Sequence, residues 1–262
     1  NVDPANGVAG TVSVNYATVD GTAKAGQDFT AISTTTMTWN DGDTAAKTFD
    51  VTLLDDSYVE NTESFTVALS SFTGGGTVTT PGTGTITDAG DSYTVSISNV
   101  SKSTVVEGTD SDVTFTVSLA NVDPANGVVG SPSVRYTTQD GSAKSATDYS
   151  AASGTLTFSG STSSYDVVVS ITNDSYVEND ETFGFDLNTA VGCSITGTDP
   201  QTVTIQDDAG DSYDVSIDSP AAVAENAGPI TFTVTLGNVD PANGVAGTVS
   251  VNYATVDGTA KA

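Results

Sequence analysis

Apolar and polar residues alternate along most of the chain, with the period of two that is typical of a β-strand with one buried face. The run Val113-Thr114-Phe115-Thr116-Val117-Ser118-Leu119 is one example, and Thr202-Val203-Thr204-Ile205 is another. Turn residues such as Gly, Asn and Asp separate these runs at intervals of about ten residues. No stretch keeps a helical period long enough to predict a helix, and no apolar run approaches the length of a membrane span. The pattern predicts an all-β protein built of antiparallel sandwiches.

The predicted strands fall into three successive groups. In the first part of the chain they include residues 48–54 and 65–69. In the middle part they are residues 92–97, 113–119, 133–138, 154–158, 165–171, 183–187 and 202–205, with the segment 106–108 between the first two. In the last part they are residues 212–217, 230–236 and 248–255, with the segment 222–226 between the first two. Only the middle group is a full set for a sandwich.

The chain repeats itself. Residues 238–262 are identical to residues 1–25, which gives a period of 237 (238 − 1), and a close copy of the first ten residues begins at Asn121. Repeats of this size match whole domains rather than solenoid units. We therefore expect a domain at 1–91 that lacks its first two strands, a complete domain at 92–211, and the opening of a third domain at 212–262.

Two explanations are open for the strands that residues 1–91 lack. In one, the chain is a window onto a long repeat protein, and the preceding repeat supplies them. In the other, a separate copy of the chain donates them head to tail, as in donor-strand fibres. The segments that join successive groups, Asp88–Tyr93 and Asp207–Tyr213, are short, so neighbouring domains are expected to lie close together.

One acidic segment occurs twice, between a predicted strand and the next. It reads DDSYVENTESF from Asp55 and NDSYVENDETF from Asn173. So many carboxylates in one short segment repel one another unless a cation lies among them, and hard oxygen ligands in this number suit calcium. A solvated acidic turn is the simpler alternative, but the repeated spacing favours a metal site.

Composition narrows the possibilities further. The chain has 33 acidic and 6 basic residues, for a net charge of −27, which argues against nucleic acids and anionic membranes as partners. There is no His and a single Cys, Cys193, so a disulfide framework, a thiolate zinc site and the commonest general base are all excluded. A small extracellular β-domain without disulfides needs another source of stability, and bound calcium can supply it.

Two motifs together resemble the Calx-β domain. The first is VDGTAKAGQDF from Val19, with a second copy, DGSAKSATDY, from Asp140; each is followed by the acidic segment. The resemblance covers essentially the whole chain and implies tandem, seven-stranded, immunoglobulin-like sandwiches that bind calcium at one end. Carried over position by position, it implies metal ligands at Asp28, Asp55, Asp56, Tyr58, Glu60, Glu63, Asp88, Glu107, Asp148, Asn173, Asp174, Tyr176, Glu178, Glu181, Asp207, Asp208 and Glu225, the two Tyr through their backbone carbonyls. Asn173 and Ala89 stand where the family has acids, which implies fewer or weaker ions.

The expected function is that of a non-catalytic, calcium-stiffened rod, secreted or on a cell surface, as part of a long adhesin or extracellular fibre. Its partners would be neighbouring copies of the same repeat. The alternatives are a strand-complemented filament subunit, a ligand-binding adhesin module and a regulatory calcium sensor. Acidity as an adaptation to salt and glycoside hydrolysis by paired carboxylates are the remaining ones. The NVDPANG sequence, which occurs three times, is either a hairpin connection or a contact surface.

Overall fold

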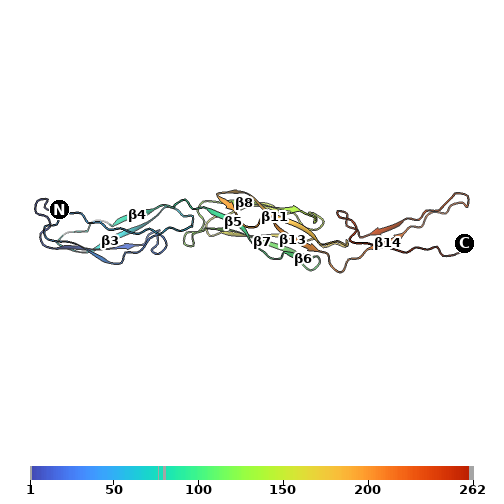
Figure 1. The fold of residues 1–262 in the computed structure, drawn as a ribbon, viewed down its shortest axis with the longest axis horizontal. Coiled ribbons are helices and arrows are strands. Elements are labelled where there is room, and N and C mark those ends of the chain that lie inside the picture. The colour runs from blue at the N-terminus through green and yellow to red at the C-terminus, as the bar shows by residue number, and fades with distance from the viewer. Residues whose placement is uncertain (1, 76, 79–80, 260–262) are drawn as a thin grey trace. The chain divides into compact units, whose positions relative to one another are not determined.

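The computed structural model describes residues 2–75, 77–78 and 81–259 (Figure 1). Within these ranges the regular structure consists of β-strands, with no α-helix. Accordingly, no helix in the described part of the chain is long and apolar enough to cross a membrane. The predicted all-β class is confirmed. It follows from the many β-branched residues in the alternating runs, because these side chains pack well on a pleated surface.

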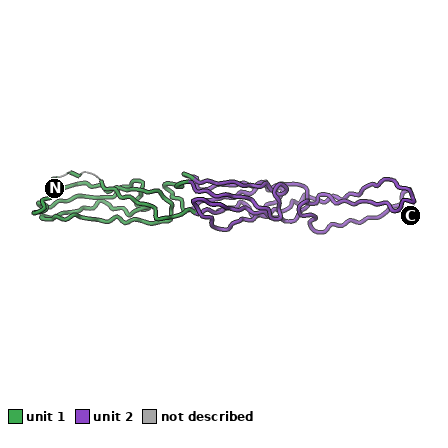
Figure 2. The backbone as a smooth tube through the Cα atoms, turned by 90° about the horizontal axis from the view of Figure 1, so that it is seen from above, with its two compact units in different colours: residues 1–93, 121–130, 159–161 green, residues 94–120, 131–158, 162–262 purple. Residues whose placement is uncertain are grey.

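The chain divides into two compact units (Figure 2). Unit 1 comprises residues 1–93, 121–130 and 159–161, and unit 2 comprises residues 94–120, 131–158 and 162–262. Residues 121–130, which contain the second NVDPANG sequence, thus belong to unit 1, although the chain on both sides of them belongs to unit 2.

Two facing sheets form the main part of unit 2. One has the strand order β10-β7-β5-β12 and the other β6-β13-β11-β8-β9. The strands are β5 (Tyr93–Val100), β6 (Thr104–Val106), β7 (Asp112–Ala120), β8 (Ser133–Asp140), β9 (Ser153–Thr157), β10 (Ser164–Ser170), β11 (Glu181–Val191), β12 (Cys193–Ile195) and β13 (Gln201–Gln206). Between residues 92 and 211, all of which are described, seven strands are five residues or longer, while β6 and β12 have three residues each. The predicted seven-stranded sandwich is confirmed, with two short strands added.

The core of this sandwich comes from alternate residues of facing strands. Along β7, Val113, Phe115, Val117 and Leu119 are buried, and the Thr and Ser between them are not. The ring of Phe115 stacks on Phe185 of β11 at a centroid distance of 4.2 Å. Because β7 and β11 belong to different sheets, this contact ties the two layers together, as the alternating pattern requires.

β6 runs parallel to β13, whereas β7 pairs antiparallel with both β5 and β10. Ser101, just after β5, still donates its N–H to Thr114 of β7, so the chain continues in the same direction as it leaves β5. It then joins the edge of the other sheet as β6 without reversing. The first strand of the fold is therefore shared between the two sheets.

Residues 212–259 form a hairpin of β14 (Asp214–Ile217) and β15 (Val234–Gly237). The strand predicted at 248–255 is wrong, because this segment forms no strand. The case is informative, since Val249–Val256 is identical in sequence to Val12–Val19, which is strand β1. A strand needs a partner for its backbone hydrogen bonds, and the described part of the chain gives residues 249–256 none.

The described residues of unit 1 form one sheet, with the strand order β2-β1-β3-β4. Its strands are β1 (Val12–Val19), β2 (Thr35–Trp39), β3 (Glu63–Thr73) and β4 (Gly82–Ile86). Ala23, Phe29 and Phe65 form a small core, in which the two Phe rings stack at 4.4 Å. The prediction of a strand at 65–69 is confirmed as part of β3.

The strand predicted at 48–54 is wrong. Only Leu53 forms a bridge, to Phe29, and the rest of the segment belongs to no strand. The corresponding segment of unit 2, β10, pairs along its whole length with β7. Residues 1–91 contain no copy of β7, so the backbone of residues 48–54 has no ladder to join.

Candidate metal centre

Both acidic segments fold in the same way. The N–H of Tyr58 donates to Oδ1 of Asp56, and the N–H of Tyr176 donates to Oδ1 of Asp174, each at 2.7 Å. An Asp that accepts from the backbone two residues ahead makes a tight local turn. The turn brings the chain back to the sheet, so that the last glutamate of each segment, Glu63 or Glu181, is the first residue of β3 or β11. The strand start fixes where these glutamates lie.

Three carboxylates converge in unit 2. Asp148, Glu178 and Glu181 each place an oxygen within 4.8 Å of the others. Asp148 comes from a turn after β8, in which its N–H donates to the carbonyl of Lys144 at 3.0 Å and its Oδ2 accepts from the N–H of Lys144. The remaining oxygen of Asp148, Oδ1, and Oε2 of Glu181 are buried without a hydrogen-bond donor. Such orphaned acceptors are costly, and a cation is the ligand that they suit.

A second set of acids lies in the same unit. Glu107 is 2% exposed, accepts from the N–H of Asp174, and feels the charges of Asp174, Asp207 and Asp148. Asp207 accepts the N–H of Glu178 at 3.1 Å through Oδ2, while its Oδ1 is buried without a partner. Asp208 and Asn173 direct oxygens at Gly108, where a Cβ would lie 2.6 Å from the first and 2.7 Å from the second. This set therefore brings together Glu107, Asn173, Asp174, Asp207 and Asp208.

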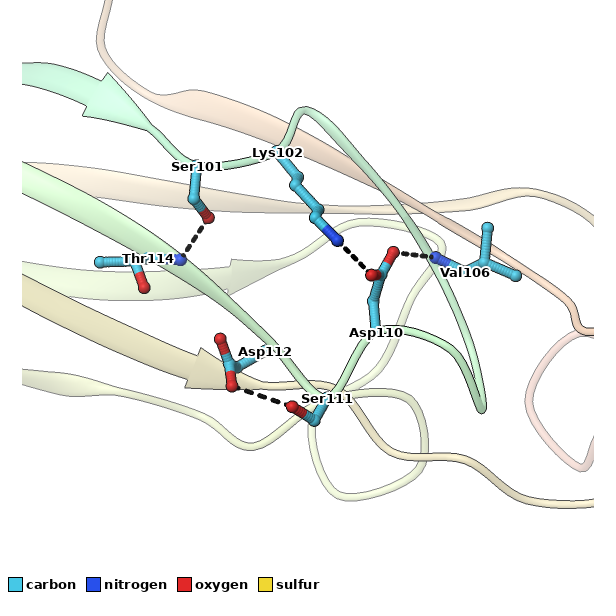
Figure 3. Close-up of polar contacts among 7 residues, drawn as sticks. All are labelled: Ser101, Lys102, Val106, Asp110, Ser111, Asp112 and Thr114. Atoms are coloured by element: carbon cyan, nitrogen blue, oxygen red, sulfur yellow. Dashed lines mark hydrogen bonds and ion pairs between the residues drawn. The ribbon is translucent and has the colours of Figure 1, made fainter.

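The turn that carries Glu107 is closed by Asp110 (Figure 3). One carboxylate oxygen of Asp110 accepts the N–H of Val106 at 3.0 Å, and the other pairs with the ammonium of Lys102. The Ser101 hydroxyl accepts the N–H of Thr114 at 2.8 Å, which anchors the start of this connection to β7. Gly108, at φ +63°, occupies the left-handed region within the turn.

Among the described residues of unit 1, three carboxylates form a matching group. Oxygens of Asp28, Glu60 and Glu63 all lie within 4.8 Å of one another. Asp88 accepts the N–H of Glu60 at 3.4 Å, the counterpart of the contact between Asp207 and Glu178. Asp55 and Asp56 are exposed, and their charges act on Asp91. Residues 1–91 contain no counterpart of Glu107, because the strand that would carry it is absent from their sequence.

The electrostatics of both groups favour a bound cation. In unit 2, burial and the neighbouring carboxylates raise the pKa of Glu107 and of Glu178 to about 8. Burial, followed by the nearby carboxylate of Asp148, raises the pKa of Glu181 to about 7. In unit 1, burial and the charge of Asp28 raise the pKa of Glu60 to about 7, and the pKa of Glu63 is raised for the same reasons. Protonation is thus how these groups relieve their repulsion when no cation is present.

The structure leaves parts of the predicted ligand set apart from these groups. Glu225 is exposed and lies in the segment 212–259, away from either acidic segment in sequence. Tyr58 and Tyr176 are half-buried within the acidic turns, where their N–H groups are used as described; the role predicted for their carbonyls stays a prediction.

The structure also adds residues that sequence reasoning missed. Asp211, in the joining segment Asp207–Tyr213, has a buried carboxylate oxygen without a donor, and burial followed by Asp208 and Asp207 raises its pKa. The NVDPANG loops add four more: Asp123 and Asn126 in unit 1, and Asp240 and Asn243 in unit 2. Asn126 donates its side-chain amide to Oε1 of Glu63 at 2.7 Å, and Asn243 donates to Oε1 of Glu181. The threefold recurrence of the loop was the only sequence signal for this contact.

The sequence matches the Calx-beta domain family in three consecutive segments, residues 2–91, 88–209 and 207–262. It is 28% identical over 219 residues to adhesion G-protein coupled receptor V1 of Danio rerio, a match that covers 82% of this chain and 4% of the receptor. Among solved structures, the apo form of the Calx CBD1 domain aligns at 25% identity over 45% of this chain and 99% of that one, with a TM-score of 0.39. CBD12 from CALX1.2 aligns at 20% identity over 76% of this chain and 88% of that one, with a TM-score of 0.37. Because the family matches nearly the whole sequence, the resemblance found in its motifs is confirmed, and the chain belongs to the Calx-beta domain family.

Proposed function

We propose that the carboxylate groups bind calcium and that the chain is a non-catalytic, calcium-stabilised module of an extracellular protein. The observation that carries this proposal is the pair of buried, donorless oxygens, Asp148 Oδ1 and Glu181 Oε2, within a group of three converging carboxylates. Hard carboxylate and carbonyl oxygens suit calcium, which takes about 6–8 of them. A sequence without His and with one Cys offers little to zinc or copper.

In unit 2 we assign Asp148, Glu178 and Glu181 to one ion position. Glu107, Asp174 and Asp207 would serve a neighbouring position, with Asn173, Asp208 and the Tyr176 carbonyl at its margin. In unit 1, Asp28, Glu60 and Glu63 would hold one ion, with Asp55, Asp56, Asp88 and the Tyr58 carbonyl at its margin. Glu225 would belong to the corresponding position of the third domain.

The ions would act through linkage. Each group concentrates negative charge that calcium neutralises, so the binding free energy adds to the free energy of unfolding. We place domain boundaries after residues 91 and 211, near the limits of the three family matches. Asp88 and Asp207 lie beside these boundaries and contact the acidic segments, so calcium would also stiffen the connection between domains.

An extracellular, structural role is supported by the relative in Danio rerio, which is named an adhesion receptor, and by the tandem arrangement of the matches. The net charge of −27 is compatible with a medium rich in calcium. We infer a rod that forms part of a long surface adhesin or fibre, with neighbouring repeats as its partners. The family consists of binding modules, and the acidic residues cluster as metal ligands do, so we propose no catalytic role.

The test is calcium titration of the full chain by isothermal calorimetry after chelation, with magnesium as the control ion. We expect saturable calcium binding with a Kd of about 10⁻³ M or tighter, which is sufficient outside cells. Small-angle scattering should show a longer maximum dimension with calcium than with chelator. No binding at millimolar calcium would overturn the calcium proposal. Binding without a change in dimension would overturn the stiffening alone.

A second candidate, the strand-complemented filament, is favoured by one observation. Residues 212–259 expose an apolar surface that includes Ile217, Phe232, Val234, Tyr253 and Val256, the last two about nine-tenths exposed. Such a surface suits a partner sheet. Sedimentation over a range of concentrations separates the two candidates, since a filament subunit polymerises and a rod segment does not.

A further inference from the structure

The NVDPANG loop occurs three times within this chain, so the hydrogen bonds of the three copies can be compared directly. In all three copies an Asp closes the loop: Asp3, Asp123 and Asp240 accept the N–H of the second residue after them at 2.8, 2.8 and 2.7 Å. The backbone turn is the same as well, because the carbonyl of each Asp accepts the N–H of the Gly four residues on. The loop is therefore a preformed unit whose shape does not depend on its surroundings.

What differs between the copies is the side-chain amide of the Asn. Asn6, with no acidic segment beside it, turns back and donates to Oδ2 of its own Asp3 at 2.8 Å. Asn126 instead donates to Glu63, and Asn243 to Glu181 and, at 3.3 Å, to the carbonyl of Ser142. The carboxylates of Asp123 and Asp240 are 2% and 3% exposed, whereas Asp3 is exposed. The same residues thus make a different contact wherever an acidic segment is present.

Backbone hydrogen bonds also join the second and third copies of the loop to the acidic segments. Val59 donates its N–H to the carbonyl of Asn121 at 3.0 Å, and Val177 donates to Asn238 at 3.1 Å. These bonds lie four residues before Glu63 and Glu181, so the loop contacts each acidic segment at two points, its middle and the glutamate that begins the next strand. The same backbone bond and the same amide bond occur in both copies. This repetition indicates that the contact between the loop and the acidic segment is a regular feature of the fold.

We propose that the NVDPANG loop is a positioning element of the metal centre: the amides of Asn126 and Asn243 fix one oxygen of Glu63 and Glu181, so that the other is presented to the cation. In unit 2 the presented oxygen is Glu181 Oε2, which is buried without a donor. Outer groups that orient a ligand in this way reduce the conformational cost of metal binding. This inference rests on the proposed binding of calcium.

A consequence concerns the loop itself. Seating the loop buries Asp240 near Glu181 and Asp123 near Glu63, which adds a negative charge to each group. The cation offsets that charge, so calcium and the seated loop stabilise each other. By linkage, the factor by which the seated loop tightens calcium equals the factor by which calcium favours the seated loop.

The experiment compares the full chain with the double variant Asn126→Ala/Asn243→Ala and with the matched control Asn6→Ala. Calorimetry should show about a tenfold or greater loss of calcium affinity in the double variant, a typical cost of removing an orienting group, and no loss in Asn6→Ala. Europium in place of calcium gives a second readout, because its luminescence lifetime counts bound water. A glutamate that is no longer oriented should let additional water reach the ion in the double variant only.

Hydrogen–deuterium exchange without metal completes the design. A purely structural role of the two Asn residues would speed exchange of residues 121–127 and 238–244 but leave the calcium affinity and the europium hydration unchanged, and that result would overturn the inference. Unchanged affinity in the double variant with a calcium-binding parent chain overturns the inference alone. A parent chain that takes up no calcium overturns the proposed function and this inference together.

Discussion

Replacing Asp148 by Asn should change the stability of unit 2 in opposite directions with and without calcium. The substitution keeps the size of the side chain, and its oxygen can still accept the N–H of Lys144. It removes one of three charges and places an N–H₂ group beside Glu181, whose Oε2 has no donor. The chelated protein should therefore become more stable, whereas calcium binding should be weakened.

The geometry sets the magnitude. With oxygens within 4.8 Å of one another, two ionised carboxylates repel by about 3.5 kcal/mol at an effective dielectric constant of about 20. The alternative, protonation of Glu181 with its pKa near 7 instead of the usual 4.5, corresponds to a cost of about 3 kcal/mol. Without calcium, the variant should thus gain about 1–3 kcal/mol in free energy of unfolding relative to the parent. The gain is smaller than the full repulsion because proton uptake already reduces the repulsion in the parent chain. Calcium at one hundred times its Kd should add about 2.7 kcal/mol to the parent chain and much less to the variant.

The assay is hydrogen–deuterium exchange of β11 in the full chain, in chelator and in calcium. In chelator, Asp148→Asn should slow exchange by about ten- to a hundredfold relative to the parent, because each 1.4 kcal/mol is about tenfold. Asp166→Asn, which removes an exposed charge from β10 and keeps the acceptor for Thr116, is the matched control and should change neither condition. Two outcomes would contradict the reasoning that calcium acts by relieving repulsion among these carboxylates. In one, Asp148→Asn exchanges as fast as the parent in chelator; in the other, calcium protects the variant as fully as it protects the parent.

The remaining predictions concern pH, a glycine, the core and unit 1. Glu107, Glu178 and Glu181 have raised pKa values, so protonation of these groups stabilises the chelated fold. This stabilisation is complete below about pH 4.5 and is lost as pH rises through 7 to 8, so the melting temperature of the chelated protein should fall from about pH 4.5 to about pH 8. Saturating calcium should abolish the fall; a flat profile in chelator would contradict the assignment. Gly108→Ala should weaken calcium binding in calorimetry, because a Cβ would displace the oxygens of Asp208 and Asn173, whereas Gly228→Ala, also at positive φ but with open space, should not. Phe115→Ala should cost about 3–5 kcal/mol in urea unfolding, since the ring is fully buried against Phe185; a loss below 1 kcal/mol would contradict the packing of the two sheets. Asp28→Asn should reduce the shift that calcium produces in the unfolding of unit 1, followed by the fluorescence of Trp39, the single Trp; an unchanged shift would remove Asp28 from the ligand set.

Much of the site could be read from the sequence. Asp148, Glu178 and Glu181 were expected together, as were Asp28, Glu60 and Glu63, because the acidic segment and the DGSAKSATDY motif recur as a pair. Repetition preserves local geometry, and the Asp-closed turns at Tyr58 and Tyr176 are local interactions. The contacts of Asn126 and Asn243 could not be derived in this way. They join residues 62 or 63 positions apart, and nothing in the loop says which carboxylate it will meet.

The sequence by itself determined the all-β class, the sandwich core and the position of the turns, because each depends on the alternation of apolar residues and on local turn chemistry. Tertiary structure alone decided which alternating runs become strands. Val12–Val19 and Val249–Val256 have the same sequence, yet only the first is a strand, since β2 and β3 supply its hydrogen-bond partners. Residues 48–54 make the same point, because their counterpart β10 is a strand only beside β7. A β-strand satisfies its backbone through another segment, so its sequence states a propensity and its neighbours decide the outcome.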